Sequence, residues 1–228
     1  MIVDFSLDKV VPNAAVQGRG GITTDDRKLV GALGNCSDSP DGDSAELRTR
    51  ATDDNTRLTV EIVGVKALGR SGRGWPGVHC TYRVNDSANP HLYADVTDET
   101  VPPLNELTGL IRIDDVVYVT VQYNGYAKEV NGKGNLVAAF DLCAHNRLWK
   151  SPDLTSNAAM LVHGDYLVTG YGFTSEKRFL FVLNRWSGRV VQKIGLPKSP
   201  EELRIHDGRL FVRLYDGYAV FPIENTEK

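Results

Sequence analysis

The sequence predicts an all-β protein, and three features of its 228 residues carry this prediction. Short segments rich in β-branched and aromatic residues recur along the chain, such as Val116–Val121 and Arg209–Leu214. Glycine, aspartate and asparagine stand between these segments, where tight turns would join neighbouring strands. Helix signals are sparse. The clearest, at Ser199–Glu202, predicts one helical turn at most, because strand-like alternation follows it directly.

The composition excludes several classes of protein. With 41% apolar residues the chain can bury a core, but no apolar run approaches the roughly 20 residues of a membrane-spanning helix. Its 26 basic and 29 acidic residues leave a net charge of −3, which argues against nucleic acid or a membrane surface as a partner. The segment Met1–Phe5 lacks the basic region of a secretion signal, so we expect a soluble, cytoplasmic protein unless a signal has been removed.

The three cysteines, Cys36, Cys80 and Cys143, are far apart and odd in number. They form neither a CxxC pair nor an even set, so the sequence predicts no zinc site and no disulfide framework. We expect three reduced, partly buried thiols. One disulfide with a free third thiol is the alternative if the protein is exported.

A repeat of about 43–49 residues organises the chain. An aliphatic residue, a tight acidic or glycine turn and a strand follow one another at Ile113, Val162 and Ile205, which stand 49 and 43 residues apart. A fourth copy, with its turn at Asp25, lies about two periods before the first of these, and an intermediate turn falls near residues 69–77. Three or four strands per unit at this period are typical of a β-propeller blade.

We therefore predict a single β-propeller domain over residues 1–228, with about five four-stranded blades. The last unit ends before a fourth strand can form, and the N-terminal residues alternate as a strand does, so this strand would close the ring. Two alternatives remain, namely two β-sandwich-like domains divided near Pro102-Pro103 and a fragment of a larger propeller. The expected units are residues 20–63, 64–107, 108–156, 157–199 and 200–223, the last completed by an N-terminal strand at residues 1–9.

A second motif follows the repeat turn in two units. Phe140-Asp141 is followed by Trp149, and Leu183-Asn184 is followed by Ser187-Gly188. Over about residues 108–223 this pattern resembles the pyrroloquinoline-quinone-type (PQQ-like) propeller repeat, whose second half reads Leu-Asp…Thr-Gly…Trp. The resemblance implies a propeller fold built from such repeats.

The chain departs from that pattern at His145, where the family has glycine, and at Gln192, where it has tryptophan. Residues 20–100 follow the period but not the motif. Propellers that bind the quinone are much longer and carry two adjacent cysteines, which this chain lacks. The resemblance therefore implies the fold without quinone chemistry, and we expect no cofactor.

The sequence offers no recognisable catalytic motif and no metal-ligand spacing, so we assign no catalytic residue and no metal. His163 and His206 stand at matching turn positions, beside Asp114 in the third unit. Polar turn residues facing solvent are the simpler interpretation, and a metal shared on the ring axis is the alternative. The acidic segment 38–46 and the glycine-arginine segment 69–77 are interpreted as loops rather than as calcium or anion sites.

Aromatic residues form the candidate binding site. Each strand after a repeat turn ends at a tyrosine, which leads into a glycine-containing loop with a second aromatic residue. In a propeller these loops share one face, so we expect partly exposed rings on one side of the ring, suited to binding protein or sugar. Packing between blades is the alternative role. The six residues are Tyr123, Tyr126, Tyr171, Phe173, Tyr215 and Tyr218.

These features together predict a non-enzymatic binding module that recognises another protein through loops on one face, for example a bacterial immunity or accessory protein. One alternative is a carbohydrate-binding lectin or a glycoside-active five-bladed propeller, which a central cluster of three carboxylates would reveal. A second alternative is a structural subunit whose ring is completed by another chain, which the oligomeric mass would reveal.

Overall fold

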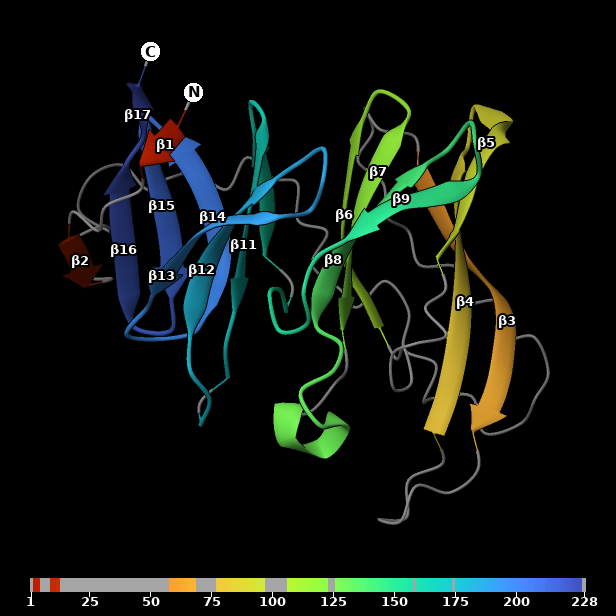
Figure 1. Ribbon diagram of the computed structural model, residues 1–228, viewed down its shortest axis with the longest axis horizontal. Helices are drawn as coiled ribbons and strands as arrows, with labels where there is room; N and C mark the ends of the chain where they lie inside the picture. The colour runs from red at the N-terminus through yellow and green to blue at the C-terminus, as the bar shows by residue number, and fades with distance from the viewer. Residues whose placement is uncertain are drawn as a thin grey trace.

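The described residues form antiparallel β-sheets and one short 3-10 helix in the computed structural model. Three of the sheets have four strands, one has three and one has two. The larger sheets stand side by side across Figure 1, in chain order from right to left. The structure describes residues 2–4, 9–12, 58–68, 77–96, 106–122, 126–157, 159–173 and 175–226.

The strands of each sheet are as follows. The first sheet contains β3 (Leu58–Leu68), β4 (Gly77–Asp86) and β5 (Asn89–Val96). The second contains β6 (Glu106–Ile113), β7 (Val116–Gln122), β8 (Leu136–Asp141) and β9 (Asn146–Lys150), with the helix η2 (Ala127–Val130) between β7 and β8. The third contains β10 (Met160–His163), β11 (Tyr166–Tyr171), β12 (Phe179–Asn184) and β13 (Val190–Gly195). The fourth contains β14 (Pro200–His206), β15 (Arg209–Leu214), β16 (Gly217–Pro222) and β2 (Lys9–Pro12). The short sheet pairs β1 (Ile2–Asp4) with β17 (Glu224–Thr226).

The repeat turns found in the sequence join the first two strands of each four-stranded sheet. Asp114-Asp115 joins β6 to β7, Gly164-Asp165 joins β10 to β11, and Asp207-Gly208 joins β14 to β15. The first residue of each turn has a positive φ, of 55°, 55° and 48° respectively. Two-residue hairpin turns favour this conformation, and glycine and aspartate adopt it readily. The repeated residues are thus the ones that these turns need.

A second repeated turn joins the last two strands of three sheets. It begins at Asp86 after β4, at Asp141 after β8 and at Asn184 after β12. In each case the side-chain oxygen accepts the backbone N–H groups two and three residues later, at 2.8–3.2 Å. The sequence motif identified the turn at Asp141 and Asn184 but missed Asp86, because the polar Asn85 precedes it instead of a large apolar residue.

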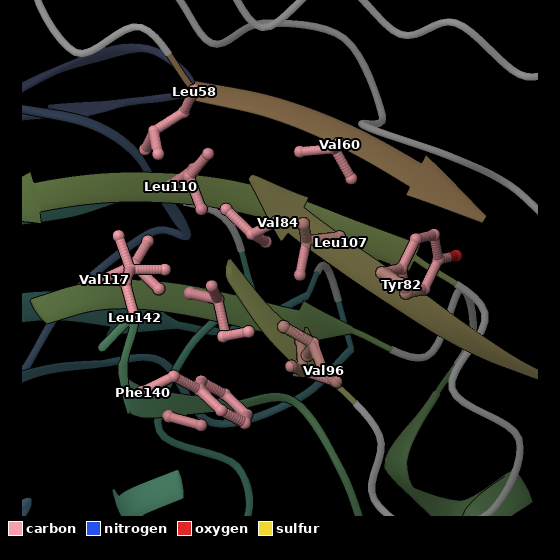
Figure 2. Packing of buried hydrophobic residues seen from close by; sticks show 14 of the residues in the cluster. Leu58, Val60, Tyr82, Val84, Val96, Leu107, Leu110, Val117, Phe140 and Leu142 are labelled. Atoms are coloured by element: carbon pink, nitrogen blue, oxygen red, sulfur yellow. The ribbon is translucent and has the colours of Figure 1, made fainter. Parts of the chain in front are cut away.

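Central strands are buried on both faces between neighbouring sheets. In β8, Leu136, Ala138 and Phe140 pack with the first sheet, whereas Val137 and Ala139 pack with the third. Figure 2 shows the first of these cores, in which side chains of the first sheet meet those of β6, β7 and β8. Burial on both faces explains why such strands read as unbroken apolar runs in the sequence.

The same core argues against a division into two sandwich-like domains. Its residues come from both sides of Pro102-Pro103, from Leu58 to Leu142, and form one continuous cluster. A domain boundary would separate two cores instead. The Pro102-Pro103 segment itself lies outside the described residues.

The last sheet takes its fourth strand from the N-terminal part of the chain, as predicted, but from other residues. The strand next to β16 is β2, in which Lys9 lies opposite Val220 and Pro12 opposite Gly217. The predicted segment 1–9 contributes mainly β1, which pairs with β17 beyond the end of the sheet. Val10 and Val11 are β-branched and suit a strand, whereas the predicted segment 1–9 is interrupted by aspartates at positions 4 and 8.

Two further expectations require correction. No helical turn forms at Ser199–Glu202, because Pro200 begins β14 opposite Leu214. Proline is tolerated at the first position of a strand, where its missing N–H is least costly. The expected boundary between the first two units, at residues 63 and 64, falls inside β3. Most of the expected first unit lies outside the described residues.

An ion pair ties the first sheet to the second. Nη1 of Arg112 on β6 lies 2.7 Å from Oδ2 of Asp86, and the two side chains are 16% and 10% exposed. Nε of Arg112 also donates to the backbone oxygen of Asp114 at 2.7 Å. The Arg112 guanidinium, together with backbone N–H donors from Ala88 and Asn89, holds the pKa of the Asp86 carboxyl below its ordinary value.

We expect this pair to make the protein acid-sensitive. Since the pKa of Asp86 is lower in the folded than in the unfolded chain, the pair stabilises above the unfolded pKa of about 3.9 and the effect is lost as pH falls through the folded pKa. The melting temperature of Asp86→Asn should therefore fall less steeply below about pH 4 than that of the wild type. The exposed Asp216→Asn serves as control and should follow the wild type. Parallel curves for Asp86→Asn and wild type would contradict this expectation.

Candidate functional site

The connections between second and third strands lie together on one edge of the sheets, which we call the loop edge. Their described parts are residues 126–135 between β7 and β8, residues 172–173 and 175–178 between β11 and β12, and Tyr215-Asp216 between β15 and β16. In Figure 1 this edge is the lower one, marked by η2, whereas the β6–β7 and β10–β11 turns lie at the opposite edge. The predicted aromatic loops therefore share one edge.

Three of the predicted aromatic residues meet where the second and third sheets adjoin. The ring of Phe173 lies 6.0 Å from that of Tyr126 and 5.9 Å from that of Tyr171, measured between centroids. The interplanar angles of 70° and 89° give the edge-to-face geometry that aromatic pairs favour. These residues form one aromatic cluster that bridges two sheets.

Glu176, which the sequence did not reveal, fixes this cluster. Its Oε1 accepts the backbone N–H of Ala127 at 2.7 Å, and its Oε2 accepts the hydroxyl of Tyr171. Burial and the hydrogen bond to Glu176 raise the pKa of the Tyr171 phenol, so the phenol stays protonated and remains a donor at neutral pH. Glu176 thus connects η2 of one sheet to the loop of the next, and no local sequence pattern marks such a contact.

The structure divides the predicted aromatic residues by exposure. Tyr171 is 3% exposed, which corrects the expectation that its ring is partly exposed, because at the end of β11 it packs between the second and third sheets. Tyr126 is 38% exposed and Tyr215 is 79% exposed. Tyr218 is half-buried in β16, and Tyr123 lies outside the described residues.

Charged groups surround the two exposed rings. Nζ of Lys128 lies 5.5 Å from the ring centroid of Tyr126, close enough for a cation–π contact. Beside Tyr215, Lys198 and Asp216 form an exposed ion pair at 3.8 Å. Exposed tyrosine with a polar surround is a composition typical of binding surfaces.

The remaining candidates from the sequence do not assemble into a site within the described residues. No three His, Cys, Asp or Glu side chains of this part of the chain come together as a metal site. His163 ends β10 and is half-buried, and His206 ends β14 with Nε2 3.2 Å from the Asp207 carboxylate. Segments 38–46 and 69–76 lie outside the described residues.

Cys143 is exposed, which corrects the expectation of a partly buried thiol, because it lies in the turn after β8. Cys36 lies outside the described residues, and so does the side chain of Cys80. No helix within the part of the chain that the structure describes has the length and apolar character needed to cross a membrane.

On the edge opposite the loop edge, a tryptophan of one sheet packs on a turn of the next. Trp149 of β9 donates its indole N–H to the backbone oxygen of Arg185 at 2.9 Å. Gly188 lies against the same ring, where a Cβ atom would come within 2.4 Å of Cε3. The first and second sheets repeat the arrangement, with the ring centroids of Tyr93 and His145 3.9 Å apart. His145 has a φ of 57°, close to the φ of 69° at Gly188, so the two turns share a backbone conformation.

Replacing Gly188 by alanine should lower the free energy of unfolding by about 2 kcal/mol. The added methyl group would overlap the Trp149 ring, and the positive φ of 69° is strained for any residue with a Cβ atom. Urea denaturation measures the loss. Gly195→Ala is the matched control, because nothing lies within 4 Å of its Cβ position. Equal stability of the two variants would show that Gly188 does not contact Trp149 closely.

Comparisons with known proteins concern the fold. No protein-family model matches the chain, and no curated protein matches it. Among solved structures the chain is similar to the computationally designed Ika4 protein, with a TM-score of 0.46 and 17% identity over 71% of this chain and 92% of that chain. It is also similar to the designed Ika8 protein, with a TM-score of 0.46 and 16% identity over 72% of this chain and 48% of that chain. BamB from Moraxella catarrhalis gives a TM-score of 0.33 and 14% identity over 74% of this chain and 67% of that chain. The described residues form an all-β, propeller-like arrangement of antiparallel sheets.

Proposed function

We propose that the protein is a non-enzymatic binding module that recognises another protein through the loop edge. The observation that carries this proposal is the exposure of Tyr215 and Tyr126, at 79% and 38%, on connections that share one edge. Tyrosine is enriched at the core of binding interfaces and is among the residues that dominate binding energy.

The contacts around Tyr126 and the turn that carries Tyr215 are consistent with a binding role. Tyr126 is held by Phe173, and the adjoining backbone N–H of Ala127 is bound by Glu176. Tyr215 projects from a tight turn between two paired strands. Rings presented on a preformed frame lose little conformational entropy when a partner binds.

For the architecture we propose a five-bladed propeller built from PQQ-like repeats. Burial of the central strands on both faces supports stacked blades, and the contacts of Trp149 on Gly188 and of Tyr93 on His145 support a repeated blade-to-blade contact. The count of five follows from the repeat period in the sequence, because most of the expected first unit lies outside the described residues. The pairing of β2 with β16 would then close the ring.

Site-specific photo-crosslinking tests the binding role. A photoreactive phenylalanine analogue replaces Tyr126, Tyr215 or, as control, Leu148, which is 49% exposed on the outer strand β9. In lysate of the source cells we expect one protein to crosslink at both tyrosine positions and not at Leu148. Tyr215→Ala should then weaken binding of that protein by about 2 kcal/mol with little change in melting temperature. Crosslinking that is absent, or equal at all three positions, would contradict the proposal.

A further inference from the structure

The turn between β12 and β13 lies on the edge opposite the loop edge and has a fixed backbone. Oδ1 of Asn184 accepts the N–H groups of Trp186 and Ser187, at 3.1 and 3.0 Å, and the Ser187 hydroxyl at 2.9 Å. From the neighbouring sheet, Trp149 binds the backbone oxygen of Arg185. These contacts hold the turn at both ends, so the side chain between them has a defined position.

That side chain is Trp186, which is 59% exposed yet held on two sides. The guanidinium carbon of Arg185 lies 4.1 Å from its ring centroid, and its Nε1 donates to Oδ1 of Asp165 at 3.4 Å. No other aromatic ring or cation among the described residues covers the indole. An exposed indole that is already oriented loses little entropy on binding, and tryptophan is the residue type most enriched in binding hot spots.

The turn also carries two arginines, Arg185 and Arg189, and the carboxylate of Asp165 lies against it. Nε of Arg185 is buried, and none of the described residues offers it an acceptor. Neither Arg185 nor the exposed Arg189 forms an ion pair with a described carboxylate, and Asp165 already faces the indole N–H. A ligand cannot reach the buried Nε, so its carboxylates would pair with the terminal nitrogens of the Arg185 guanidinium and with the exposed Arg189.

We propose that the Trp186 turn is a second interaction surface, which binds an acidic segment of a partner protein that carries an aromatic residue. Carboxylates of this segment pair with Arg185 and Arg189, while its ring stacks on the uncovered face of Trp186. The inference is independent of the function proposed for the loop edge. A protein segment is favoured over a neutral glycan, because the turn carries two arginines and a neutral sugar offers them no carboxylate.

Binding to an immobilised random copolymer of glutamate and tyrosine tests this surface, with interferometry as the readout. We expect wild-type protein to bind and added salt to weaken the binding. Trp186→Ala and Arg185→Gln should each weaken it by more than about tenfold, and Trp186→Phe by less. Polyglutamate, which lacks the ring, should bind more weakly than the copolymer. Melting temperatures establish that each variant is folded.

The double variant Tyr126→Ala/Tyr215→Ala separates this inference from the proposed function. It should bind the copolymer as the wild type does. If it loses binding while Trp186→Ala retains it, the acidic segment belongs to the loop edge and the present inference is wrong. Polygalacturonate that binds more tightly than the copolymer, and depends on Trp186, would assign the turn to an acidic glycan instead. Failure of the wild type to bind the copolymer, or unchanged binding by Trp186→Ala, would also overturn the inference.

Discussion

Replacing Tyr171 by alanine should lower the free energy of unfolding by about 3 kcal/mol or more. Tyr171 is 3% exposed and packs in the core between the second and third sheets, so its removal leaves a cavity. It also takes away the hydroxyl that donates to Glu176, which leaves that carboxylate oxygen without its donor. Chemical denaturation measures the loss directly.

Two control variants identify the cause. Tyr171→Phe keeps the ring and removes the hydroxyl alone, so it should cost about 1 kcal/mol. Tyr215→Ala, at the 79% exposed position, should change stability by less than about 0.5 kcal/mol. If Tyr171→Ala were no less stable than Tyr215→Ala, the burial of Tyr171 would be contradicted.

Deleting residues 1–12 should lower stability by an amount on the order of 3–4 kcal/mol. The deletion removes β2 from the edge of the last sheet and β1 from its pairing with β17. The backbone hydrogen bonds of β16 on that side would be lost, and an unpaired strand edge would be exposed, which favours aggregation. Thermal unfolding measures the change.

A shorter deletion, of residues 1–4, removes β1 while keeping β2 and serves as control. It should cost much less, because it leaves the four paired positions between β2 and β16 intact. An unchanged melting temperature after deletion of residues 1–12 would show that the N-terminal strand contributes nothing to the last sheet.

The sequence predicts the parts of this fold that depend on neighbouring residues. Hairpin turns at Asp114, Gly164 and Asp207 follow from residues that adopt positive φ between β-branched runs. The grouping of Tyr126 with Phe173 also follows, because equivalent loops of a repeat must lie on one edge. Local conformational preference and periodicity carry this information within a few residues.

Other features depend on residues far apart in the chain, and the sequence does not reveal them. Glu176 binds Ala127 across 49 residues, and nothing near either residue marks the contact. The burial of Tyr171 depends on the neighbouring sheet that covers the end of β11. The choice of β2 over the preceding residues depends on which segment meets the free edge of β16. In each case the partner is set by packing rather than by local preference.

The pairing of β2 with β16 has a consequence for synthesis on the ribosome. The second and third sheets each use contiguous chain, so each can assemble soon after its own residues emerge. The last sheet instead pairs β2 with β16, so β2 must wait until Gly217–Pro222 has been translated. Non-local pairing of this kind is slow. Completion of this sheet is therefore a late folding step, and its rate sets how long this part of the protein stays open to chaperones and proteases.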